Sequence, residues 1–219
     1  MSTRQKFDDD LDELRLNILE LGKMVDQRIG SATQSLINQD LELANTIVVG
    51  DLVVNELQAI IEEKCILLIA TQQPFARDLR KLVAGFKISL YLERMGDLSV
   101  DLAKLTIRIG RTKFIKPLID IPRMSDLIQE MLDKGLKAYV QEACEAASLM
   151  ATMDDEVDKL YSHSYDDLQA LMREDPDKVT QANYLLFACR FLERMGDYCT
   201  NIAEEIVYLC TGKRANLNE

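Results

Sequence analysis

Apolar residues recur every three or four positions along most of the chain, a spacing that places them on one face of an α-helix. The pattern is sustained through residues 7–37 and predicts a first long helix there. A second helix is predicted over residues 41–70. Because this segment is apolar on several sides, we expect it to be a central, well-buried helix. The third helix is predicted to start near Pro74, which suits a first helical turn, and to end near Ile109.

The second half of the chain repeats this plan. Helices are predicted over residues 123–140 and 143–172, and from the turn at Pro176 to about Leu209. The short connections predict antiparallel neighbours, and therefore an all-α fold made of two tandem three-helix bundles. We place the first bundle at residues 1–112 and the second at residues 118–219, on either side of a basic connector that contains proline.

An internal duplication supports this division. The segment Leu-Glu-Arg-Met-Gly-Asp occupies residues 92–97 and returns unchanged at residues 192–197. A weaker repeat relates residues 51–57 to residues 154–160, each beginning with an aspartate on the second helix of its half. Each half therefore carries acidic residues four positions apart on both its second and its third helix.

Carboxylates at positions i and i+4 share one face of a helix and repel each other, so something positive is expected opposite them. If the two helices of a half turn these residues to the same side, their oxygens could bind a hard cation or a small metal cluster. The candidate ligands are Asp51, Glu93, Asp97 and Asp101 in the first half, and Asp154, Asp158, Glu193 and Asp197 in the second.

The same residues allow a simpler interpretation, in which each acidic pair is a solvated helix face. The duplication of four such pairs favours a metal site. The halves are expected to differ, because Asn55 stands where the second half has Asp158, and Asn201 where the first has Asp101. Gly96 allows either a close approach of two helices or room for a ligand, and so does its counterpart Gly196. Three arginines are interpreted as ion-pair partners of nearby carboxylates: Arg94, Arg190 and Arg194.

Composition excludes several classes of function. The formal net charge of −11 argues against nucleic acid as the main partner, because phosphate binding needs clustered Lys and Arg. An acidic surface suits cations or basic protein surfaces instead. The single histidine, His163, cannot supply the Glu-x-x-His pairs of di-iron carboxylate bundles, and no Gly-rich phosphate loop or Ser–His–Asp set is present. We therefore predict a binding or signalling module, not an enzyme.

The five cysteines form no Cys-x-x-Cys pair and mostly lie among apolar residues. We expect them to be reduced and buried, in a reducing compartment. Residues 1–15 are acidic and polar and do not resemble a signal peptide, and the longest apolar runs are too short to span a bilayer. The protein is expected to be soluble and cytoplasmic, with any membrane association made through partners.

Several of these motifs together resemble the PhoU family. They are the two Leu-Glu-Arg-Met-Gly-Asp segments, the Gln-Pro-x-Ala-x-Asp-Leu-Arg run at residues 73–80 and the Asp-Asp-Glu-Val-Asp run at residues 154–158. The resemblance covers about residues 7–211. It implies a cytoplasmic, all-α and usually dimeric protein that negatively regulates the phosphate-starvation response. Such proteins link PstB, the ATPase of the phosphate transporter, to the sensor histidine kinase PhoR.

Some members of the family carry multinuclear metal clusters, iron in particular, held by acidic motifs. On this resemblance, iron is the first choice of cofactor, ahead of zinc, manganese or magnesium. The positions that match the family pattern are Glu93, Asp97, Asp154, Asp158, Glu193 and Asp197. Two alternatives stay open: a metal-free adaptor whose acidic stripe binds basic partner residues, and a metal store or carboxylate-bridged metalloenzyme unrelated to phosphate signalling.

Overall fold

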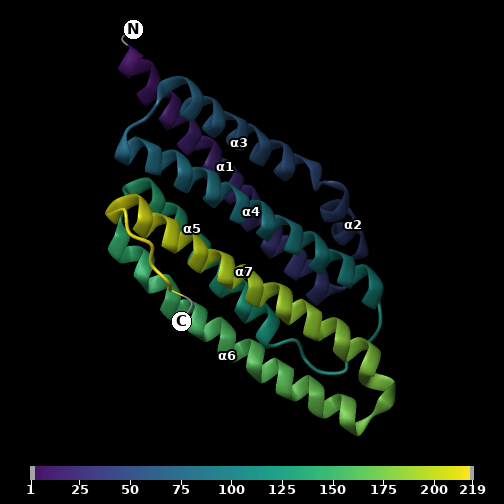
Figure 1. The fold of residues 1–219 in the computed structure, drawn as a ribbon. Helices are drawn as coiled ribbons and strands as arrows, with labels where there is room; N and C mark the ends of the chain where they lie inside the picture. The colour runs from purple at the N-terminus through teal and green to yellow at the C-terminus, as the bar shows by residue number, and fades with distance from the viewer. Residues whose placement is uncertain (1–2, 218–219) are drawn as a thin grey trace.

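The all-α prediction is confirmed. The computed structural model describes the backbone of residues 3–217 and the side chains of residues 4–145 and 149–217. Within these residues the chain forms seven α-helices and one short 3₁₀ helix, with no strand (Figure 1). The elements are α1 (Thr3–Asn38), α2 (Leu41–Val49), α3 (Leu52–Gln72), α4 (Ala76–Ile109), α5 (Asp120–Gln141), α6 (Cys144–Glu174), η1 (Pro176–Lys178) and α7 (Val179–Thr211).

The helices form two bundles that lie side by side (Figure 1). Helix α1 packs with α2, α3 and α4 in the first bundle, and α5, α6 and α7 pack together in the second. The bundles meet where α4 runs along α7 and α1 along α5, which leaves α3 and α6 on opposite outer sides. Buried side chains form one hydrophobic cluster that continues across both bundles. The division at residues 112–118 falls in the connector between α4 and α5, and separate domains stay a prediction.

The prediction of one continuous helix over residues 41–70 is wrong, because this segment forms two helices, α2 and α3. The N–H of Gly50 donates to the carbonyl of Thr46 at 3.0 Å and ends α2. Arg28 of α1 donates to the carbonyl of Gly50 and pairs with the Asp51 carboxylate at 3.1 Å, so it binds both residues of the break. Glycine is a poor helix former, and this arginine stabilises the interruption at that point.

The expected burial of this segment is also wrong for α3. Its inner side contributes buried Val54, Ile61 and Leu68 to the core. Its outer side leaves Leu52 68% and Leu67 57% exposed. Helix α3 is apolar on several sides, as the sequence indicated, but it packs mainly on α1 and α4 and is not enclosed by other helices.

The expectation that all five cysteines are reduced is wrong for two of them. Cys144 and Cys210 form a disulfide that joins the start of α6 to the end of α7. The antiparallel packing of these helices brings the two Cα atoms to 6.4 Å, within the range that a disulfide spans. Cys65, Cys189 and Cys199 are free and buried, as predicted. None of the helices in the described chain is long and apolar enough to cross a membrane.

Candidate metal centre

The acidic residues predicted for the second half come together between α6 and α7. Asp154 and Asp158 lie one turn apart on α6, and Glu193 and Asp197 one turn apart on α7. Gly196 is what allows the close approach. A Cβ atom at this position would lie 2.5 Å from Oδ1 of Asp154, so only glycine leaves room for that carboxylate. The close approach of two helices at Gly196 is therefore confirmed, and an acidic side chain of α6 fills the space; room for a ligand stays a prediction.

Two carboxylate oxygens in this group are buried without a hydrogen-bond partner. Asp154 is only 8% exposed, and its Oδ1 has no hydrogen-bond partner in the part of the chain that the structure describes. Oε2 of Glu193 is likewise buried and unpartnered. An unpaired buried carboxylate oxygen is costly, so this arrangement favours a proton or a cation at the site.

The pKa values of all four carboxyl groups are raised. Burial raises the pKa of Asp154 from 3.8 to about 7, and the charges of Asp158, Asp197 and Glu193 add to the effect. Burial is also the main cause of the raised pKa of Asp158, Glu193 and Asp197. Neighbouring carboxylates contribute to the raised pKa of all three, Asp155 in the case of Asp158. The group therefore carries more negative charge than its surroundings stabilise.

Arginines neutralise only part of this charge. Arg190 forms an ion pair with Glu193, as predicted from their spacing. Arg194 differs from its predicted role, because its guanidinium donates to the hydroxyl of Tyr198 at 3.3 Å. It still lowers the pKa of Glu193 and Asp197 through its charge. Among the described residues, no cation lowers the pKa of Asp154, which lies at the buried end of the group.

The corresponding group in the first half is more fully neutralised. Asp51 precedes α3 and pairs with Arg28 at 3.1 Å. On α4, Arg94 lies 3.5 Å from Glu93 and 3.6 Å from Asp97, which confirms its predicted role. Asp101 pairs with Lys104 at 2.9 Å. The two halves therefore differ, and the second is the better candidate for a cation.

The acidic group of the first half shares two features with that of the second: raised pKa values and buried oxygens without a partner among the described residues. Burial and the neighbouring acidic residues raise the pKa of Glu93 and Asp97. Within the described chain, Oε2 of Glu93 and Oδ1 of Asn55 are buried without a hydrogen-bond partner. Gly96 faces Val54, whose Cγ1 would lie 3.2 Å from an added Cβ, so here glycine allows the close approach of α4 to α3.

The donor chemistry fits an oxygen-coordinated cation such as iron, manganese or magnesium, while zinc in proteins more often takes nitrogen and sulfur ligands. The positions of the side chains, however, do not yet form a coordination site. Among the described residues, no three or more His, Cys, Asp or Glu side chains are placed so that they could hold one metal ion. Binding by Asp154, Asp158, Glu193 and Asp197 would therefore need these side chains to rearrange.

Sequence reasoning missed two residues. Arg28, which neutralises Asp51, lies on the first helix, and no spacing rule connects it to a residue on another helix. Asp120 at the start of α5 is buried and accepts hydrogen bonds from Ser164 at 2.8 Å and, within 3.0 Å, from Nδ1 of His163. The side chain of His163 itself is 63% exposed.

Comparison with known proteins covers nearly the whole chain. The family model of the PhoU domain matches residues 18–106 and 121–206. A phosphate-specific transport system accessory protein PhoU homolog of Clostridium acetobutylicum is 38% identical over 99% of this chain and 100% of the relative. The homolog of the same name from Rhizobium meliloti is 34% identical over 94% of this chain and 87% of the relative.

Two solved structures share the fold. The crystal structure of PhoU from Pseudomonas aeruginosa superposes with a TM-score of 0.91 at 29% identity, covering 94% of this chain and 100% of that one. The phosphate transport system regulatory protein PhoU from Streptococcus pneumoniae gives a TM-score of 0.90 at 30% identity, covering 96% and 99%. Family model, relatives and fold agree, and the chain belongs to the PhoU family.

Proposed function

We propose that this protein is a negative regulator of phosphate uptake and of the phosphate-starvation response. The observation that carries the proposal is its similarity, over 99% of its length, to a relative named as an accessory protein of the phosphate-specific transport system. In this proposal the protein acts in the cytoplasm as an adaptor between the transporter ATPase PstB and the sensor kinase PhoR, as a homodimer that reaches the membrane only through these partners.

The fold supports an adaptor. Two bundles that share one hydrophobic core form an extended helical body with separate outer sides at α3 and α6. Such a body can contact two partners at once while keeping a fixed distance between them. Its net charge of −11 favours partner surfaces that are basic.

In this proposal a bound cation would stabilise the packing of α6 against α7. Asp154, Asp158, Glu193 and Asp197 would hold it after rearranging, and Asp51, Glu93, Asp97 and Asp101 would form the weaker counterpart. A bound cation supplies positive charge that offsets the repulsion between carboxylates on the two helices. The metal-free alternative is that basic side chains of a partner supply this charge directly, which the exposed Asp158 would allow.

Complementation tests the regulatory role. The chain is expressed in a bacterium that lacks its own PhoU, and phosphate uptake and a phosphate-starvation reporter are measured at high and low phosphate. We expect reporter activity and uptake to fall at high phosphate only. Unchanged uptake and reporter activity, with the protein present at normal levels, would contradict the proposal. Pull-downs with PstB and PhoR at both phosphate levels test the adaptor role separately.

The unpartnered carboxylate oxygens of Asp154 and Glu193 support a second candidate, a metal-binding helical protein such as a metal store. Elemental analysis of the purified protein, with a chelator-treated control, separates the two. Stoichiometric metal together with failed complementation would favour the second candidate. Complementation by the native protein would favour the first.

A further inference from the structure

Helix α3 presents a row of apolar side chains to solvent. We call these residues the α3 ridge: Leu52, Val53, Ile60, Ile66 and Leu67, each between 54% and 68% exposed. Scattered exposed apolar residues are normal on a protein surface, but a contiguous set on one helix usually marks a contact site. Helix α3, which carries the ridge, lies on the outer side of the first bundle (Figure 1).

The spacing within the α3 ridge indicates what shape it fits. Val53, Ile60 and Leu67 follow one another at intervals of seven residues. Leu52 and Ile66 are two such intervals apart and lie next to that row. A seven-residue repeat keeps side chains along one line of a helix, which is the pattern by which a second helix packs alongside. The ridge is therefore suited to a helix lying along α3.

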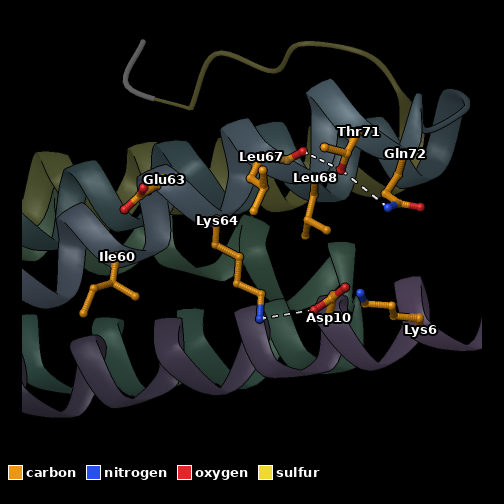
Figure 2. A pocket seen from close by; sticks show the side chains of 9 residues that line it. All are labelled: Lys6, Asp10, Ile60, Glu63, Lys64, Leu67, Leu68, Thr71 and Gln72. Carbon is orange, nitrogen blue, oxygen red and sulfur yellow. Dashed lines mark hydrogen bonds and ion pairs between the residues drawn. The ribbon is translucent and has the colours of Figure 1, made fainter.

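A groove beside the α3 ridge continues this surface. It has a volume of about 520 Å³ and lies between α3 and α1. Ile60 and Leu67 belong both to the ridge and to the wall of the groove, and Leu68 lies deeper (Figure 2). Lys64 reaches across it from α3 and lies 3.7 Å from Asp10 of α1. Large apolar side chains of an incoming helix could enter here.

The rim of this surface is acidic. Glu56 and Glu63 are exposed on α3 between the apolar series, and Glu13 is exposed on α1. The one lysine that spans the groove, Lys64, is already engaged by Asp10 and by Glu13 at 2.5 Å. Lys6 also lines the groove. An occupant with Lys or Arg beside its apolar stripe would complement this rim.

The same charges disfavour a second copy of the chain. In a parallel pairing of two α3 helices, Glu56 and Glu63 would each meet their own copy. In an antiparallel pairing centred between Ala59 and Ile60, Glu56 of one copy would fall opposite Glu63 of the other. Like charges placed opposite each other oppose association, and both copies carry a net charge of −11.

We propose that the α3 ridge and its groove bind an amphipathic α-helix of a partner protein, one with an apolar stripe at seven-residue spacing flanked by basic residues. The proposal rests on the adaptor function proposed above, and it specifies which kind of segment one partner would use to bind. The incoming helix buries its stripe on Ile60 and Leu67, and its Lys or Arg side chains pair with Glu56 and Glu63.

The test uses the purified full chain and a fluorescent helical peptide of leucine and lysine in an amphipathic order. Two control peptides accompany it, one with the same composition in scrambled order and one with glutamate in place of lysine. The variants are Leu67→Asp, the milder Leu67→Ser and the control Leu149→Asp, whose residue is 60% exposed on α6. Binding is measured by fluorescence anisotropy at about 0.15 M salt, where long-range charge attraction is screened.

We expect the amphipathic peptide to bind the native chain, and Leu67→Asp to weaken binding about tenfold or more, as removal of a central apolar contact does. Leu67→Ser should weaken it less, and Leu149→Asp should bind as the native chain does. Equal binding of the scrambled peptide, equal binding by Leu67→Asp, or no binding at all would overturn the proposal.

Two further outcomes would overturn the proposal by assigning the α3 ridge to a different binding partner. A dimer in sedimentation analysis that Leu67→Asp dissociates would assign the ridge to a second copy. Binding to phosphatidylglycerol vesicles that Leu67→Asp abolishes, without peptide binding, would assign it to a membrane. Because this assay does not measure phosphate control, complementation by a chain that fails to bind the peptide would overturn the helix-docking proposal and leave the regulatory function standing.

Discussion

Asp154 is the residue on which the candidate metal centre depends most. Its carboxyl is buried against Gly196, one of its oxygens has no partner, and its pKa is raised to about 7. Asp158 and Asp197 share the group but keep more contact with water. A residue that is costly to bury in its charged form, and that lies beside other acids, is a functional candidate on physical grounds.

Asp154 should make the metal-free protein less stable as pH rises. Between pH 3.8 and about 7 the folded chain holds this proton and the unfolded chain releases it, so the free energy of unfolding falls across that window. Asp154→Asn removes this titration. We expect the variant to show a smaller fall and to be more stable than the native chain at pH 8, by on the order of 1–3 kcal/mol.

Urea denaturation of chelator-treated protein at pH 5 and pH 8 measures the effect. Asp166→Asn is the matched control, because Asp166 is exposed on the same helix, α6, and its charge does not contribute to the raised pKa of Asp154. A native chain that gains stability from pH 5 to pH 8 by an amount that Asp154→Asn removes would contradict the assigned sign.

The sequence predicted which acidic residues belong together but not how each is neutralised. Spacing within a helix places Glu193 one turn from Asp197, and the duplication pairs α6 with α7. It cannot show that Arg28 of α1 reaches Asp51, because that contact depends on how two separate helices pack. The difference between the halves was predicted from Asn55, and the structure adds Arg28 as a second cause.

At the scale of elements, the sequence predictions that failed concern the ends of helices. Periodicity predicted the long helices because their buried faces repeat every three or four residues. It missed the break at Gly50, where the local propensity is weak and a contact from α1 stabilises the interruption. It also missed the disulfide, because Cys144 and Cys210 are 66 residues apart and meet only when α6 and α7 pack.

Replacing Cys210 by Ser should lower stability, because the disulfide closes a loop of 66 residues between the start of α6 and the end of α7. Bridges that close loops of this length typically stabilise by about 2–4 kcal/mol. Thermal unfolding with and without reductant measures the effect. We expect reductant to lower the melting temperature of the native chain and to leave that of Cys210→Ser unchanged; equal melting of the two chains without reductant would count against the bridge.

The two duplicated glycines offer a matched pair of substitutions. Gly196→Ala places a methyl group where the Asp154 carboxylate lies, so we expect it to displace that carboxylate and reduce bound cation. Gly96→Ala meets the Val54 methyl group instead, and should leave the second-half site intact. Titration of both variants with Mn²⁺ or Fe²⁺ by calorimetry measures the difference. Equal affinity in the two variants would show that Gly196 makes no room for a ligand.

At the scale of the whole molecule, duplication explains most of the architecture. Two copies of one three-helix plan pack through α4 and α7, the helices that carry the repeated acidic segment. The order of the long helices could be read from the sequence, because each copy repeats the same apolar pattern. Their number could not, because the second helix of the first half breaks into α2 and α3. The outer position of α3 could not, because apolar residues on several sides of a helix suit either a core or a docking surface.

The central claim is that the duplicated carboxylates, those between α6 and α7 above all, form a cation site. Elemental analysis of the native chain, Asp97→Ala and Asp197→Ala, each purified under identical conditions, tests it most directly. We predict stoichiometric metal in the native chain, a partial loss in Asp97→Ala and a larger loss in Asp197→Ala. A native chain without metal, or variants that keep its full metal content, would contradict the claim.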